Sequence, residues 1–259
     1  VTSKLGDADI NNKEFLEEIS RVLSKNFNSE VHIKSVVQLT EEERRNRVLR
    51  VTLKGNSKKT PRTVILKQSF PEDSEQLSKA PLSRFARDWA GLEFLTSIEA
   101  KNPLAPKFYG GSKKHNFILQ EDLGKKHITL IDALKEKDKK AAYASLKRFM
   151  GLLGEFHAEG SKKVADYQTF LHKVDPQKDT RYNETKALLD DLKLTLNKLG
   201  MSYTEEIKRE AKAALKSMFE PEHFATVVHG DICPDNVFDN PEENKMALID
   251  FEHSGVRSM

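Results

Sequence analysis

The strongest constraint on the fold of this 259-residue chain is a change in hydrophobic periodicity near Gly124. Before that glycine, several short segments alternate apolar and polar residues, which is typical of half-buried strands. Beyond it, long segments repeat their apolar residues at the spacing of amphipathic helices. A β-rich part followed by a helical part predicts an α+β fold with two lobes, residues 1–123 and 124–259, and a boundary near Asp122 to Gly124.

The elements expected before the boundary form an antiparallel sheet accompanied by helices. Helical spacing of apolar residues predicts helices over 12–26 and 83–100. Alternation predicts strands over 31–39, 47–54, 63–68, 108–111 and 116–120. After the boundary, the pattern predicts helices over 130–137, 140–160, 179–199 and 204–219, and then a short apolar run over 225–228.

Composition excludes few classes of protein and favours an ordinary soluble protein. The formal net charge is only +3, with basic and acidic residues intermixed, which gives no argument for nucleic-acid or membrane binding. No apolar run approaches the roughly 20 residues that a membrane helix needs. Cys233 is the only cysteine, so no internal disulfide can form, and a reducing, cytoplasmic setting is expected. Nothing in the sequence specifies an oligomeric state.

Two short blocks near the end of the chain carry most of the recognisable chemistry. Residues 229–236 read His-Gly-Asp-Ile-Cys-Pro-Asp-Asn, and residues 248–252 read Leu-Ile-Asp-Phe-Glu. Between them, two apolar runs flank a polar turn, which predicts a hairpin. A hairpin would return Asp250 to the neighbourhood of Asn236, so that Asp231, Asn236 and Asp250 converge on one spot.

Phosphoryl transfer is a reaction that suits these residue types. It needs positioning of the reactants and neutralisation of phosphate charge by magnesium. Magnesium prefers hard oxygen ligands, which the carboxylate of Asp250 and the amide oxygen of Asn236 can supply. The carboxylate of Asp231 can accept the proton of an incoming hydroxyl group.

The two blocks resemble the catalytic loop, His-x-Asp-x-x-x-x-Asn, and the metal motif of the aminoglycoside phosphotransferase and choline kinase family. The resemblance implies a two-lobed protein-kinase-like fold, with an antiparallel sheet lobe that binds ATP and a mostly helical catalytic lobe. It further implies that Asp231 is the base, that His229 supports the loop, and that Asn236 and Asp250 hold Mg²⁺. The acceptor would be a hydroxyl group of a small molecule, either a metabolite or an antibiotic.

Weaker similarities to the same family lie upstream. Lys67 ends a strand and resembles the lysine that contacts the α- and β-phosphates. Its expected partner is Asp88 on the next helix, where the family usually has glutamate, with Glu93 as the alternative. Residues Gln120, Glu121 and Asp122 resemble the hinge between the lobes, whose backbone would bind adenine.

The chain departs from the family pattern in two places. The segment 39–48, which would cover the phosphates, contains no glycine. Either Arg45 or Arg47 would bind phosphate, or the segment would be mobile and close only on ATP, while the acids at 41–43 face solvent. The chain also ends nine residues after Asp250, whereas family members continue with helices that build much of the acceptor site. The C-terminal lobe is therefore expected to be incomplete.

Two alternatives to a kinase stay open at this point. A pseudokinase would bind nucleotide without transferring phosphate, and the glycine-free loop favours it. A metal-dependent phosphoester hydrolase could use His229, Asp231, Asp250 and His253 as ligands. The other singled-out residues are expected to have structural roles. Cys233 and His157 would pack in the interior, and Asp235 and Asp239 would be solvated turn residues. The sequence does not identify the acceptor.

Overall fold

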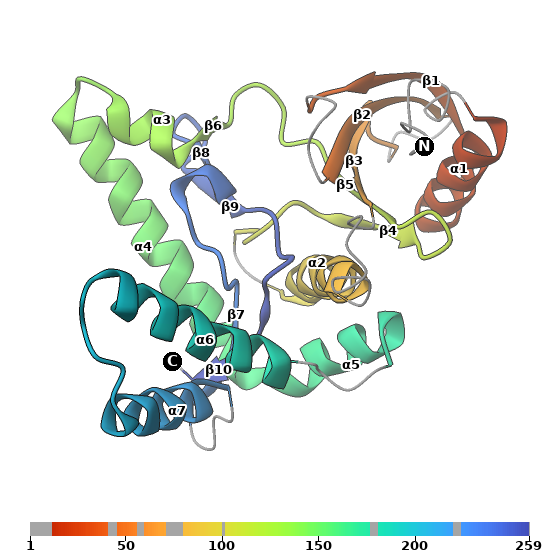
Figure 1. Cartoon of the computed structure of the whole chain (residues 1–259). Coiled ribbons are helices and arrows are strands. Elements are labelled where there is room, and N and C mark those ends of the chain that lie inside the picture. The colour runs from red at the N-terminus through yellow and green to blue at the C-terminus, as the bar shows by residue number, and fades with distance from the viewer. Residues whose placement is uncertain are drawn as a thin grey trace.

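The computed structural model describes residues 12–40, 46–55, 60–70, 80–99, 102–176, 181–219 and 224–258. The first part is built on a five-stranded antiparallel sheet of order β1-β2-β3-β5-β4 (Figure 1). Its strands are β1 (Val31–Gln38), β2 (Asn46–Gly55), β3 (Thr63–Ser69), β4 (Phe108–Ser112) and β5 (Phe117–Glu121). The predicted α+β class, with an antiparallel sheet in the first part and helices in the second, is confirmed.

Helix α1 (Lys13–Phe27) covers one face of this sheet. The side chain of Asn12 caps the helix by accepting a hydrogen bond from the backbone N–H of Glu14 at 2.9 Å. The apolar stripe of α1 packs on side chains from the central strands, including Leu49 and Leu66. Because side chains alternate across a strand, Lys67 points to the opposite face.

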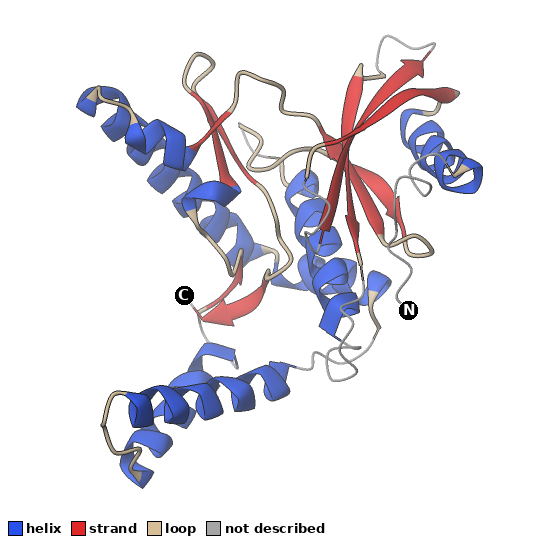
Figure 2. Ribbon diagram, turned by 45° about the horizontal axis from the view of Figure 1, so that its top comes forward, coloured by secondary structure: helices blue, strands red, loops and turns tan. Residues whose placement is uncertain are grey.

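Helix α2 (Ala80–Ser97) lies on the other side of the sheet from α1 (Figure 2). Its apolar residues belong to the larger of two hydrophobic clusters, which extends from Phe94 of α2 through Phe156 and Tyr167 to Phe251. The helix therefore packs with the second part of the chain although it precedes the boundary in sequence. This packing brings Asp88 next to the C-terminal motifs.

The second part is mostly helical. Its helices are α3 (Leu130–Lys135), α4 (Lys139–Lys162), α5 (Val164–Val174), α6 (Arg181–Lys198) and α7 (Glu205–Phe219). Two small sheets complete it: β7 (Ala225–Val228) pairs with β10 (Gly255–Ser258), and β8 (Val237–Asn240) lies between β6 (Ile128–Thr129) and β9 (Lys245–Leu248). No helix in the described ranges is long and apolar enough to cross a membrane.

The structure differs from the expected elements in a few places. No helix was predicted over the residues of α5, which follows α4 with only Lys163 between them. The short strands β6 and β10 were not predicted either, since each has too few residues to show a period. Helix α2 ends at Ser97, three residues before the expected end.

Candidate active site

The first motif forms a tight loop between β7 and β8. Gly230 adopts φ 84°, and a Cβ atom there would lie 2.1 Å from the carbonyl oxygen of His253, so the backbone can pass only as glycine. Asp231 follows and is exposed. A 3₁₀ turn (Pro234–Asn236) then folds the chain back, and Asn236 Nδ2 donates to the carbonyl oxygen of Asp231 at 3.0 Å.

The predicted hairpin brings the two motifs together. Strands β8 and β9 pair antiparallel, with Val237 opposite Leu248. One step further, the backbone N–H of Ile249 donates to the carbonyl oxygen of Asn236 at 3.0 Å. Asn236 and Asp250 therefore lie side by side. Because Nδ2 of Asn236 is engaged, its Oδ1 is the amide atom left for a cation, which together with the Asp250 carboxylate suits a hard metal ion.

The side chain of His229 connects the two motifs. It is buried, and Nε2 lies 2.8 Å from the carbonyl oxygen of Ile249, which assigns the proton to Nε2. Nδ1 then accepts the backbone N–H of Asp231 at 3.4 Å. Burial lowers the pKa of His229, so the ring stays neutral near pH 7. Both ring nitrogens are thus engaged within the protein.

Lys67 reaches the site from the sheet. Its Nζ lies 2.8 Å from Asp88 Oδ2 and 2.5 Å from Asp250 Oδ1, so the predicted pairing with Asp88 is present. Burial alone would lower the pKa of Lys67, but the two carboxylates outweigh it and raise the pKa above its usual value. The alternative partner, Glu93, is occupied elsewhere, because it binds Trp89 Nε1 at 2.7 Å and Lys173 Nζ at 2.8 Å.

The residues expected to form the hinge have contacts of their own. Asp122 accepts two hydrogen bonds from the guanidinium group of Arg50, at 2.7 and 3.2 Å, and one from the N–H of Gly124. Burial would raise the pKa of Asp122, but these donors outweigh it and lower the pKa. The N–H of Glu121 donates to the carbonyl oxygen of Lys107. Gln120 pairs with Ile65 within the sheet.

The structure corrects the expected role of Arg47. Arg47 pairs with Gln68, whereas Lys67 pairs with Val48, so Arg47 and Lys67 lie on opposite faces of the sheet. The guanidinium group donates to Gln68 Oε1 at 2.5 Å and stacks over the Phe70 ring. Arg47 is therefore part of the face that α1 covers and does not reach the site. The other expected phosphate ligand, Arg45, and the acids at 41–43 lie outside the described residues.

Two further polar contacts near the motifs were not predicted. Asn46 Nδ2 donates to Glu252 Oε2 at 3.0 Å and so connects the start of β2 with the second motif. Asp239 was expected in solvent but is fully buried: its Oδ2 lies 2.6 Å from Arg148 Nη2 and from Ser145 Oγ. The prediction that Asp239 is a solvated turn residue was wrong, because β8 extends through Asn240 and turns this side chain inward.

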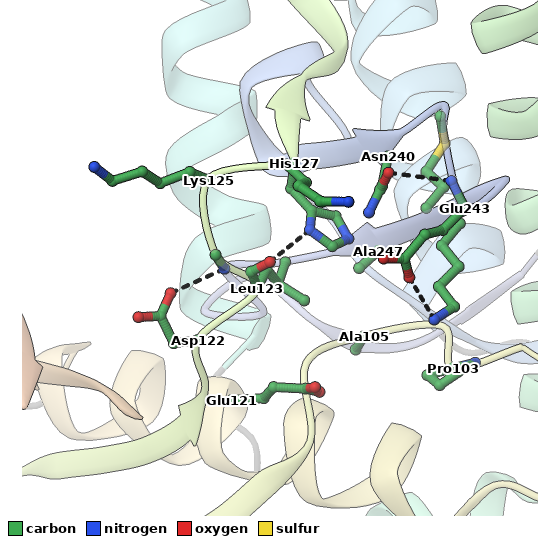
Figure 3. A pocket seen from close by; sticks show the side chains of 14 residues that line it. Pro103, Ala105, Glu121, Asp122, Leu123, Lys125, His127, Asn240, Glu243 and Ala247 are labelled. Carbon is green, nitrogen blue, oxygen red and sulfur yellow. Dashed lines mark hydrogen bonds and ion pairs between the residues drawn. The ribbon is translucent and has the colours of Figure 1, made fainter. Parts of the chain in front are cut away.

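A separate hollow of about 340 Å³ lies beside the hinge (Figure 3). Its walls come from the segment before β4, from residues 121–127 and from the β8–β9 hairpin. The side chain of Glu121 points toward Pro103 and Ala105, whereas Asp122 points away from them. Glu121 and Asp122 line this hollow, whereas Lys67 and the residues of the two motifs do not.

Comparisons with known proteins relate the chain to a family of phosphotransferases. The model of the phosphotransferase enzyme family matches residues 34–258. No curated protein matches the chain. Among solved structures, the GDP and kanamycin complex of APH(2")-IIia is similar, with 15% identity over 92% of this chain and 73% of that chain, and a TM-score of 0.50. The Plasmodium vivax ethanolamine kinase shares 12% identity over 90% of this chain and 59% of its own, with a TM-score of 0.48.

Proposed function

The chain belongs to the phosphotransferase enzyme family, and on that premise we propose that it transfers the γ-phosphate of ATP to a hydroxyl group of a small molecule. The observation that carries the proposal is the convergence of Lys67, Asp88 and Asp250 in direct contact, beside Asn236 and Asp231. Residues 1–123 would supply the nucleotide-binding lobe and residues 124–259 the catalytic lobe, in a reducing, cytoplasmic setting.

In this proposal, Asn236 Oδ1 and the carboxylate of Asp250 hold Mg²⁺. Two protein ligands suffice, because magnesium usually keeps its other positions for water and phosphate oxygens. When bound, the ion neutralises the charge that develops on the transferred phosphoryl group. Lys67 binds the α- and β-phosphates with its ammonium group, and Asp88 keeps that group oriented. The hinge backbone at residues 120–122 receives the adenine ring.

Asp231 is the proposed base. Its side chain is exposed, so a hydroxyl group of the acceptor can approach it. Asn236 Nδ2 lies 3.0 Å from the carbonyl oxygen of Asp231 and 3.4 Å from its Oδ2, which holds the loop in one conformation. The carboxylate accepts the hydroxyl proton as the acceptor oxygen forms its bond to phosphorus.

The two alternatives receive less support. A hydrolase that used His229 as a ligand conflicts with the hydrogen bonds on both of its ring nitrogens. Within the described residues, no group of three or more His, Cys, Asp or Glu is placed to hold a metal ion. A pseudokinase would be expected to lack part of the site, whereas this chain has Lys67, Asp231 and Asp250, and Lys67 contacts Asp250.

The decisive experiment compares Asp231→Ala with Asp235→Ala, an exposed aspartate of the same loop. A panel of hydroxylated metabolites and antibiotics, starting with kanamycin and ethanolamine, is first screened for acceptor-dependent ATP consumption. We expect Asp231→Ala to lower kcat by about 10²- to 10⁴-fold, the usual contribution of a general base. Its affinity for ATP and magnesium should stay unchanged, and Asp235→Ala should keep its turnover. Full turnover of Asp231→Ala would refute the assignment of the base.

Nucleotide binding can be tested without knowing the acceptor. ATP with magnesium should raise the melting temperature, because a ligand that binds only the folded state stabilises it. The rise should be lost when EDTA removes the metal and when Asp250 is replaced by alanine. A pseudokinase would show a rise that does not depend on the metal and no phosphate transfer. A hydrolase would release phosphate from model esters without any acceptor.

A further inference from the structure

We propose that Asp88 is a positioning residue for the metal ligand Asp250, and that Gly91 sets a helix-to-loop spacing at which aspartate fits and glutamate does not. The inference rests on the proposed function, because it takes Asp250 as a metal ligand. It goes beyond an ion pair with Lys67, since it gives Asp88 a second partner and explains why this chain has the shorter acid.

The backbone of Asp250 needs support from its neighbours. Its φ of 66° lies in the left-handed region, which disfavours residues with a Cβ atom. Such a conformation persists only where the surroundings hold it. The residue before it, Ile249, is held by Asn236 and by His229, as described above. The residue after it, Phe251, donates its N–H to Asp88 Oδ1 at 2.9 Å in a buried position.

Asp88 therefore divides its carboxylate between two partners. Oδ2 binds Lys67 Nζ at 2.8 Å, and Oδ1 binds the backbone N–H of Phe251. The side chain is only 5% exposed, so it is shielded from solvent. Each oxygen has a specific place, and together they connect the sheet, α2 and the backbone next to Asp250.

The close approach of α2 to the second motif fixes the positions of the two carboxylate oxygens of Asp88. A Cβ atom at residue 91 would lie 2.6 Å from Phe251 Cβ and 3.0 Å from Ser254 Oγ. On the same side of α2, the carbonyl oxygen of Arg87 accepts a hydrogen bond from Ser254 Oγ at 3.0 Å. Tyr167 lies 3.0 Å from that hydroxyl group and is fully buried. The turn at 251–254 is thus docked directly on the helix.

At this spacing a longer acid cannot make both contacts. Glutamate adds one methylene group, about 1.5 Å of chain. In a close-packed interior, such an addition displaces its neighbours or takes a strained rotamer. A glutamate at position 88 could keep the ion pair with Lys67, but it would push its second oxygen against Phe251 and shift the backbone that carries Asp250.

The test compares Asp88→Glu with the wild type and with Asp88→Asn. Binding of Mn²⁺ to the complex with a non-hydrolysable ATP analogue is followed by electron paramagnetic resonance, and binding of the analogue without metal is followed by calorimetry. Asp88→Glu should weaken Mn²⁺ binding by roughly 10- to 100-fold, as loss of a hydrogen bond that orients a metal ligand does. Asp88→Glu keeps a carboxylate for Lys67, so metal-free binding of the analogue should fall much less than Mn²⁺ binding. Asp88→Asn keeps an acceptor for Phe251 but loses the charge that faces Lys67. It should therefore weaken metal-free binding more than Asp88→Glu does, and the additional loss of Mn²⁺ binding should be smaller than in Asp88→Glu.

A second pair of variants leaves every charge in place. Gly91→Ala should also weaken Mn²⁺ binding, because its methyl group displaces Phe251. Gly154→Ala, a helix glycine with open space around it, is the matched control and should bind Mn²⁺ normally. If Asp88→Glu fails to fold, Gly91→Ala decides the question. Unchanged Mn²⁺ affinity in folded Asp88→Glu or Gly91→Ala would overturn the inference, whereas a wild type that binds no metal–nucleotide complex would instead overturn the proposed function.

Discussion

At the scale of single residues, the ion pair between Asp239 and Arg148 fastens the hairpin that brings the two motifs together. Asp239 lies on β8, three residues after Asn236, and Arg148 lies on α4. Arg148 Nε and Nη2 donate to the two oxygens of Asp239 at 2.9 and 2.6 Å, and Ser145 adds a third donor. A fully buried carboxylate with three hydrogen bonds is stable only while its partners remain.

Removing one partner of this pair should therefore destabilise the protein strongly. We expect Arg148→Ala to lower the free energy of unfolding by about 3–5 kcal/mol, because it leaves the Asp239 charge buried without its cation. Urea denaturation followed by circular dichroism measures the change. Lys245→Ala, which removes the exposed pair with Glu243, is the control and should have little effect. Equal effects of the two variants would contradict the assigned burial.

At the scale of elements, the glycines of α4 serve different purposes along one helix. Apart from its chain neighbours and the backbone of its own helix, Gly154 has no heavy atom within 4 Å of the position that a Cβ would take. Gly160, near the end of the helix, has Thr226 Oγ1 at 2.8 Å and the carbonyl oxygen of Val227 at 3.0 Å from that position. Only the second glycine is required by packing, because it lets α4 lie against β7, the strand that leads into His229.

Alanine substitutions should separate these two glycines. Gly154→Ala should raise the free energy of unfolding by about 0.5–1 kcal/mol, since alanine loses less backbone entropy in a helix. Gly160→Ala should lower it by about 1–3 kcal/mol, since the added methyl group forces α4 and β7 apart. Thermal unfolding of both variants tests the pair. Stabilisation by Gly160→Ala would show that α4 does not approach β7 as closely as described.

At the scale of the whole molecule, two histidines make stability depend on pH. Burial lowers the pKa of both His229 and His157, so the folded protein binds fewer protons than the unfolded chain as the pH falls. Stability gained from the neutral rings is thus complete above the unfolded pKa of about 6.5. It is lost as the pH falls from that value through the lower folded pKa.

The free energy of unfolding should therefore decrease between pH 7.5 and pH 5.5. His229 alone can contribute a slope of at most about 1.4 kcal/mol per pH unit. Urea midpoints measured across this range provide the test. His157→Gln, which removes the more exposed of the two rings, should flatten the dependence only partly. A wild-type stability that rises on acidification would contradict the burial of His229 in its neutral form.

Much of the site could be predicted because its defining contacts are local. His229, Asp231 and Asn236 share one loop, and a short hairpin returns the chain to Asp250, so residue order and turn chemistry were enough to bring these groups together. The alternation of β2 also indicates the face of Arg47, which has the same parity as Leu49 and Val51, both fully buried, and so lies on the core face.

Hydrophobic periodicity, motif spacing and turn residues act over a few positions, and by themselves they determined the α+β division, most elements and the hairpin that brings the two motifs together. The tertiary structure decided which distant groups meet. Lys67 reaches Asp250 across 183 positions, and Asp88 reaches Phe251 across 163. It also decided that Asp239 is buried and that an aspartate fits at position 88. Such outcomes depend on how closely packed elements approach one another, which no local pattern encodes.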